Sequence, residues 1–204
     1  MRNSSNIANE LSEQTKNDYP LFAEYCNLLD KGIRKVALKY LDAFLEITKN
    51  WDFTTKAIFC KQVFNASKSD NDLDIVLTTN LSDKLIKPTL LEMTLVEPEN
   101  FLPFKWYGLY FHDTIFLKKA YEINPSDNST KLNLLRRLEN DLWLSTHHLP
   151  EAYLGDYTED ENDINLAFSI LATFDKIAEE NYTKLFSHFR DDINNYIMTY
   201  SFKN

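Results

Sequence analysis

Side chains that could carry chemistry gather between positions 98 and 157 of this chain. Two of the three tryptophans, three of the four histidines and four of the six prolines lie there. Histidine can act as an acid, a base or a metal ligand, and tryptophan and tyrosine often anchor binding partners. The cluster therefore marks either a demanding packing junction or a binding site.

His147 and His148 are the first candidates for a metal or catalytic site. Adjacent residues on a helix point roughly 100° apart, so these two side chains cannot both bind one metal ion from regular helical positions. The spacing to Glu151 does not fit a zinc-protease helix, and Pro150 interrupts the element that would carry it. We expect no metal and no cofactor, and a histidine that caps the end of a helix.

An acidic segment follows the two histidines. It holds no lysine or arginine, and its acids are Glu151, Asp156, Glu159, Asp160, Glu161 and Asp163. Gly155 precedes most of these acids, which does not fit a calcium loop, where the glycine sits among the ligands. We expect a solvated acidic loop from 149 to 163, with Asp160 or Glu161 leading into the next helix. The alternative is that this loop is a charged docking surface for a basic partner.

Aromatic side chains crowd the segment 104–112. Trp106 and Tyr110 fall on one side of a helix there, and Phe104, Tyr107 and Phe111 fall on another. One interpretation is a helix buried on two sides, with Gly108 allowing a close approach. The other is a partner or ligand groove anchored by Trp106 and Tyr110.

Motifs for nucleophilic catalysis, phosphate binding or dinucleotide binding do not occur in this sequence. Three isolated glycines cannot build a glycine-rich phosphate cradle. An enzyme would therefore have to bring its catalytic residues together from distant parts of the chain.

Helices must position these residues, because three glycines in 204 residues are too few for the turns of a β fold. Apolar residues recur at helical spacing along most of the chain. The expected helices are 19–30, 32–50, 53–66, 81–87, 90–96, 104–112, 113–123, 127–147, 164–178 and 182–200. We predict an all-α fold of about eight to ten helices packed as antiparallel pairs. Only 74–78 could form a strand.

No glycine-, serine- or proline-rich linker interrupts the sequence, which indicates how the chain is divided into domains. We expect one all-helical domain over 18–204, preceded by a flexible segment or short helix over 1–17. Asp18 and Asp52 are the expected N-caps of the helices that follow them, and Pro88 should end or kink its helix.

The segment LKKAYEINPSD, residues 117–127, resembles the end of the second helix of a tetratricopeptide repeat. In such a repeat this helix end has a small residue, an apolar pair, a proline and a polar turn before the next helix. The corresponding residues of this chain include Ala120, Tyr121, Ile123 and Pro125. The resemblance covers these residues alone, and no second copy occurs. It implies a helix end at a proline turn and repeat-like packing of helices.

Charge and composition restrict the partners. The net charge of −9 opposes binding to nucleic acid, and no window is apolar enough for a membrane span. The sequence shows no secretory signal, so we expect a cytoplasmic protein in which Cys26 and Cys60 are reduced and buried.

These observations favour a protein that binds another protein, with a basic partner. Its predicted binding residues are Trp106, Tyr110, His147, His148, Glu151, Asp156, Glu159, Asp160 and Glu161. An immunity or antitoxin-type inhibitor of a basic protein is a specific version, because opposite charge speeds association. One rival is an enzyme or small-molecule binder with a pocket between helix 104–112 and the His147/His148 helix end. Another is a structural domain that forms homo-oligomers.

Overall fold

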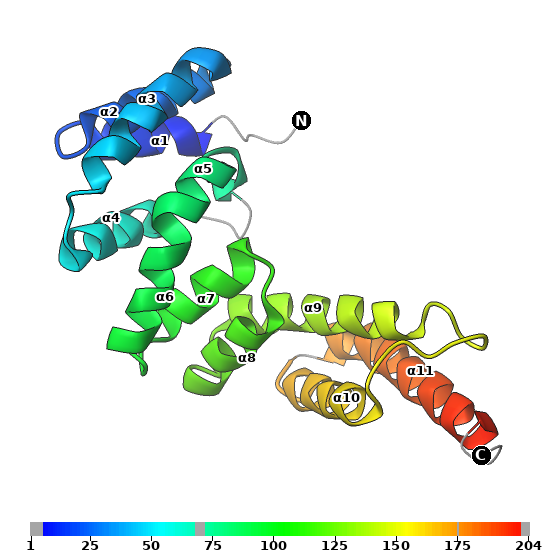
Figure 1. Ribbon diagram of the computed structural model, residues 1–204. Coiled ribbons are helices and arrows are strands. Elements are labelled where there is room, and N and C mark those ends of the chain that lie inside the picture. Colours follow the sequence, from blue (N-terminus) through cyan, green and yellow to red (C-terminus); the bar gives the residue numbers. More distant parts are fainter. Residues whose placement is uncertain (1–5, 68–71, 175, 201–204) are drawn as a thin grey trace. The chain divides into compact units, whose positions relative to one another are not determined.

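The computed structural model describes residues 6–67, 72–174 and 176–200, and helices make up all the regular structure in these ranges (Figure 1). The predicted all-α fold is confirmed. Residues 1–5, 68–71, 175 and 201–204, which belong to the predicted segments, lie outside the described residues. The chain divides into two compact units, 1–124 and 125–204. Each unit is described by itself, and a single domain over 18–204 stays a prediction.

The first unit contains the helices α1 to α8. Their bounds are α1 Asn6–Thr15, α2 Pro20–Asp30, α3 Arg34–Thr48, α4 Phe53–Asn65, α5 Thr79–Leu81, α6 Lys87–Val96, α7 Phe101–Tyr110 and α8 Thr114–Ile123. A short 3-10 turn, η1 (Asp72–Ile75), lies where a strand was conceivable from the sequence, and a π-helical turn, η2 (Ser82–Ile86), joins α5 to α6. Successive helices pack together, as α1 does with α2, α2 with α3 and α7 with α8.

Aspartates start two helices of the first unit, and one of them, Asp52, is a predicted N-cap. The Asp52 carboxylate accepts a 2.7 Å hydrogen bond from the Thr55 N–H at the start of α4, and Asp113 does the same for α8. This bond satisfies one of the N–H groups that a helix start leaves without a partner. The prediction for Asp18 is wrong: Tyr19 is the N-cap of α2, with Pro20 at the start of the helix.

Pro88 does not end its helix. The chain stays helical from Thr79 to Val96, and η2 lies directly before the proline. Proline lacks an N–H group and its ring clashes with the carbonyl of the preceding turn, here that of Lys84. The wider π-helical turn gives room at this point, so the run continues.

Aromatic rings fill the core of the first unit around Phe59. Its ring centroid lies 4.9 Å from that of Phe22, 5.2 Å from that of Phe44 and 5.8 Å from that of Trp51. Cys26 and Cys60 are buried free thiols, and burial raises the pKa of both. Both cysteines therefore act as small apolar residues of the core.

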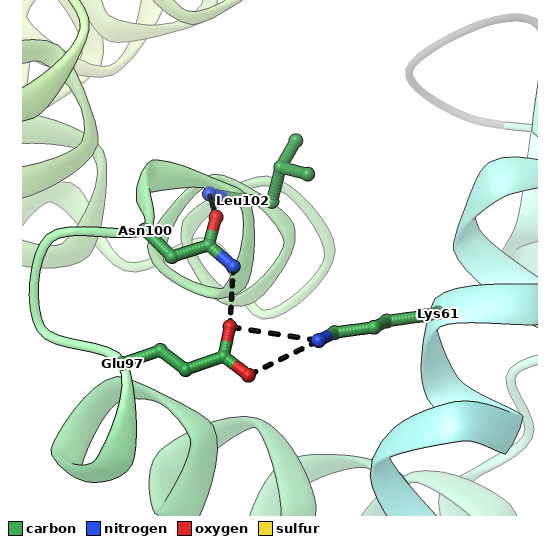
Figure 2. A network of polar contacts seen from close by, with 4 residues as sticks. All are labelled: Lys61, Glu97, Asn100 and Leu102. Carbon is green, nitrogen blue, oxygen red and sulfur yellow. Dashed lines mark hydrogen bonds and ion pairs between the residues drawn. The ribbon is translucent and has the colours of Figure 1, made fainter.

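A polar network links α4 to the end of α6 and the start of α7 (Figure 2). Glu97 follows α6. Its carboxylate accepts hydrogen bonds from Lys61 Nζ of α4 at 3.1 Å and from Asn100 Nδ2 at 2.6 Å. Asn100 in turn caps α7, because its Oδ1 accepts the Leu102 N–H at 3.1 Å. The hydrogen bonds from Asn100 and Lys61 lower the pKa of Glu97.

The second unit contains α9 (Asn128–Thr146), α10 (Tyr157–Leu171) and α11 (Lys176–Tyr200). The three helices pack against one another. Their buried apolar residues include Leu134, Leu138, Leu142, Ile164, Ile170, Phe186 and Ile193. Helix α8 ends before Pro125 and α9 follows at once, as the repeat-like segment predicts. Within the described residues, no helix is long and apolar enough to cross a membrane.

Candidate functional site

The predicted binding residues divide between the two units. Trp106 and Tyr110 lie on α7 in the first unit, whereas the histidines and acids lie in the second. The predicted pocket between helix 104–112 and the His147/His148 helix end would combine residues of both units, and it stays a prediction.

Trp106 is a packing residue of the first unit. Its side chain is 7% exposed, and its ring stacks on Phe64 of α4 with centroids 4.9 Å apart. Tyr110 also contacts Phe64, at 5.3 Å, and its hydroxyl lies 3.0 Å from Ser67 Oγ. The sequence-based role of Trp106 as a surface anchor is therefore corrected, because an indole buried against another ring offers little area to a partner.

The opposite side of α7 faces α8, which explains the crowding of aromatic residues. The Tyr107 ring stacks on Phe116 with centroids 4.2 Å apart. Gly108 permits the close approach, since a Cβ there would lie 2.6 Å from Leu117 Cγ and 2.8 Å from the Leu117 backbone nitrogen. The interpretation of a helix buried on two sides is the one that the structure supports.

Three neighbouring rings at the end of α9 are exposed, and two of them are stacked. Trp143 and His147 are one helical turn apart, and their ring centroids lie 4.6 Å apart at an interplanar angle of 16°. The His148 ring follows at 4.1 Å from that of His147. Trp143 is 53% exposed, and both histidines are exposed. An exposed tryptophan held by a neighbouring ring is a preformed contact site.

His147 also caps its helix, as the sequence predicts for one of the two histidines. It is the C-cap residue of α9, and its Nδ1 donates to the Leu144 carbonyl oxygen at 2.9 Å. This bond fixes the ring against which Trp143 stacks. Trp143 is absent from the predicted site residues, although its spacing of four from His147 on a helix was the signal that could have found it.

The acidic segment is only partly a loop. Helix α10 begins at Tyr157, and the Asp156 carboxylate caps it by accepting the N–H groups of Thr158 and Glu159 at 2.9 and 3.0 Å. The prediction of a loop to 163 is wrong because Glu159 and Asp160 lie in the first turn of α10. Negative side chains are favourable there, next to the positive end of the helix dipole.

Asp160 is buried, so the structure corrects its predicted place on the docking surface. The residue is 8% exposed, and its carboxylate accepts hydrogen bonds from the Tyr153 hydroxyl at 2.6 Å and from Ser145 Oγ at 3.3 Å. Burial raises the pKa of Asp160, and burial together with the bond to Asp160 raises the pKa of Tyr153. Gly155 leaves room for the carboxylate, since a Cβ at Gly155 would collide with it.

Glu161 is paired within the second unit. Its carboxylate lies 3.1 Å from Arg190 Nη2 of α11, and Arg190 also donates to Asn165 Oδ1 at 2.7 Å. This pairing neutralises the acid locally. Of the predicted acids, Glu151, Asp156 and Glu159 are exposed, and Asp156 serves as the cap of α10.

Charge is distributed unequally along the chain. Residues 125–204 hold fourteen Asp and Glu against seven Lys and Arg, a net charge of −7, whereas residues 1–124 hold seventeen against fifteen, a net charge of −2. No lysine or arginine occurs from 138 to 175. The stacked rings therefore lie in the most acidic part of the sequence. Among the side chains that the structure describes, no three His, Cys, Asp or Glu groups lie together as a metal site would need.

Comparison with known proteins found no matching protein family, no matching curated protein and no matching solved structure. The candidate site is thus defined by its own geometry.

Proposed function

We propose that this protein binds a basic protein partner through an exposed surface of its second unit. We assign to this surface Trp143, His147 and His148, whose rings lie next to one another, together with the exposed acids Glu151 and Glu159 of the segments that follow, and we call it the ring-and-acid surface. The observation that carries the proposal is the exposed Trp143 ring, stacked on His147 in a unit whose net charge is −7. It replaces Trp106 as the aromatic anchor.

The chemistry of the surface favours lysine and arginine on the partner. A cation over a tryptophan ring gains about 0.5–1 kcal/mol at an exposed site and more when water is excluded. Because the stack on His147 already orders the indole, binding costs less side-chain entropy. The acids Glu151 and Glu159 attract positive charge, which raises the association rate more than the affinity.

An immunity or antitoxin-type inhibitor remains the specific version of this proposal. An acidic surface with a rigid aromatic anchor could cover a basic active site or a basic nucleic-acid-binding face of the partner. The charge of the second unit and the exposed Trp143 support binding to a toxin-like partner and binding to any other basic protein equally.

The test is quantitative capture of proteins from an extract of the cells that make this protein. Wild-type protein is compared with the triple variant Trp143→Ala/Glu151→Lys/Glu159→Lys. The matched control is Leu95→Ala/Glu92→Lys/Asp42→Lys, which makes the same change in charge at exposed residues of the first unit. We expect a basic protein whose recovery falls at least about ten-fold in the triple variant, equivalent to ~1.4 kcal/mol, and not in the control.

Two outcomes would contradict the proposal. One is recovery of the same proteins in equal amounts by the wild type and the triple variant. The other is an equal loss in both variants, which would assign the binding to overall charge. Added salt should weaken a genuine interaction of this surface, since screening acts on exposed charges.

A further inference from the structure

We propose that a cavity in the first unit binds a small organic anion that carries an apolar body. The cavity has a volume of about 710 Å³ and lies among the end of α2, the start of α3, η1 and the start of α5. Ligand sites for small molecules typically measure about 300–1,000 Å³. This site is separate from the ring-and-acid surface, and the inference does not depend on the proposed function.

The apolar part of the cavity comes from two sides. Leu29 and Leu38 line it from α2 and α3, and Ile75 and Leu77 line it from η1 and the segment that follows. Ile75 is 44% exposed, so its side chain has apolar surface that a ligand can cover. Burying these side chains under the apolar body of a ligand would stabilise the complex by about 25 cal/mol per Å².

The polar part of the cavity has one cation, Arg34, at its lining. Among the described side chains, none forms an ion pair with Arg34. The Arg34 charge acts on the buried Tyr25: burial raises the pKa of this hydroxyl to about 12, and the arginine opposes the rise. A guanidinium without a carboxylate partner is the group that proteins use to hold a carboxylate or phosphate.

The sequence around Arg34 is positive, in contrast to the chain as a whole. Lys31, Lys35 and Lys39 are exposed, and no ion pair to another described side chain occupies them. They follow one another at a spacing of four, next to the lining residues Gly32, Arg34 and Leu38. Four cations between 31 and 39, in a protein of net charge −9, create a local attraction for an anion.

The remaining polar lining suits a single anionic head group. Thr79 and Asn80 offer hydroxyl and amide groups, and Thr78 lines the cavity beside them. The Thr78 hydroxyl is buried next to Tyr25, and its interaction with the Tyr25 hydroxyl partly opposes the rise of the Tyr25 pKa. The neighbouring Tyr25 hydroxyl gives its own proton to the Val76 carbonyl at 2.7 Å. Asp74, the acid in the lining, offsets part of the Arg34 charge, so the lining favours a ligand with a single anionic group. The ligand class is therefore one carboxylate or one phosphate ester on a short apolar chain.

The test uses isothermal titration of the full chain with four probes. Octanoate and octyl phosphate carry the proposed chemistry with either head group, 1-octanol carries only the apolar body, and inorganic phosphate carries only the anion. We expect binding of octanoate, octyl phosphate or both, at least about ten-fold tighter than binding of 1-octanol and of inorganic phosphate. The tighter of the two anions identifies the head group.

Variants then locate the site. Arg34→Met should weaken binding of the preferred probe at least about ten-fold, and Ile75→Asp should weaken it by a similar factor because it adds a negative charge to the apolar wall. Arg136→Met makes the same substitution as the first variant at an exposed position of the second unit and should leave binding unchanged. Circular dichroism of each variant checks that its helices are intact.

Three results would overturn the inference. These are the absence of binding by both anions, equal binding of 1-octanol, and equal affinity of the wild type and the folded Arg34→Met variant. Loss of binding in Arg136→Met as well would count against the site, since it would show an effect of overall charge.

Discussion

The Tyr153 hydroxyl donates a 2.6 Å hydrogen bond to Oδ2 of Asp160, and this bond ties the segment after α9 to the first turn of α10. Tyr153 lies between the exposed Glu151 and the cap residue Asp156. The ring-and-acid surface therefore depends on a buried carboxylate that takes no part in it directly. This dependence can be tested without knowledge of the partner.

Removal of the Tyr153 hydroxyl should destabilise the second unit. Tyr153→Phe leaves the buried Asp160 carboxylate with the longer bond from Ser145, so we expect a loss of about 1.5–3 kcal/mol, the usual range for a hydrogen bond to a charged group. Urea unfolding measures this change. Tyr157→Phe is the matched control, because Tyr157 is exposed and its hydroxyl makes only a 3.3 Å bond to Asn194. The control should lose less than about 0.5 kcal/mol, and an equal loss in both variants would contradict the role of the Tyr153 bond.

Asp160 should give the protein a specific dependence on pH. Its pKa is raised in the folded protein by burial, above the value of about 3.9 for an unfolded chain. Between these two values the folded state binds more protons than the unfolded state, so this group's contribution to the free energy of unfolding decreases as pH rises. Above the raised pKa the contribution is constant.

The measurement for Asp160 is a difference between two proteins. The free energy of unfolding of the wild type minus that of Asp160→Asn should fall as pH rises through this window and then level off. Taking the difference removes the contributions of other carboxylates, such as Glu97, whose pKa is shifted in the opposite direction. A difference that increases with pH would show that the charged form of Asp160 is favoured by folding.

Replacement of Gly108 by a larger residue should destabilise the first unit, because α7 and α8 approach closely there. A Cβ at this position would lie 2.8 Å from the Leu117 backbone nitrogen and 3.0 Å from the Asp113 carbonyl oxygen, and backbone atoms cannot rotate away. We expect Gly108→Ala to cost about 1–3 kcal/mol, although alanine is the better helix former. Gly32→Ala provides a comparison, since a Cβ there meets no atom within 4 Å but the backbone has a φ of +74°. Gly32→Ala should lower the free energy of unfolding by about 1 kcal/mol, from backbone strain alone. Thermal unfolding measures both costs, and a Gly108→Ala variant as stable as the wild type would contradict the predicted crowding.

Trp143 should be the tryptophan most open to solvent. It is 53% exposed, whereas Trp106 is 7% exposed. Acrylamide quenching of tryptophan fluorescence should therefore fall clearly in Trp143→Phe and change little in Trp106→Phe. Equal quenching in the two variants would mean that Trp143 is covered, and the ring-and-acid surface would lose its anchor.

Much of the secondary structure follows from local sequence. Asp52 caps α4 as predicted, because the cap and the N–H group that it binds are three residues apart. Asp113 caps α8 with the same spacing. The start of α10 was missed, since its first turns are polar and the apolar pattern begins only at Ile164. Acidic residues in a first turn look like a loop when only hydrophobic spacing is considered.

Local sequence is sufficient to predict the all-α fold, the Asp52 cap of α4 and an aromatic and acidic region between 98 and 157. The tertiary structure decided which of those side chains are exposed: Trp106 is covered by Phe64, Asp160 is buried with Tyr153, and Trp143 remains open. The physical reason is the range of the interactions. Helix formation depends on residues three or four apart, whereas burial depends on contacts between elements that the helical pattern alone does not pair.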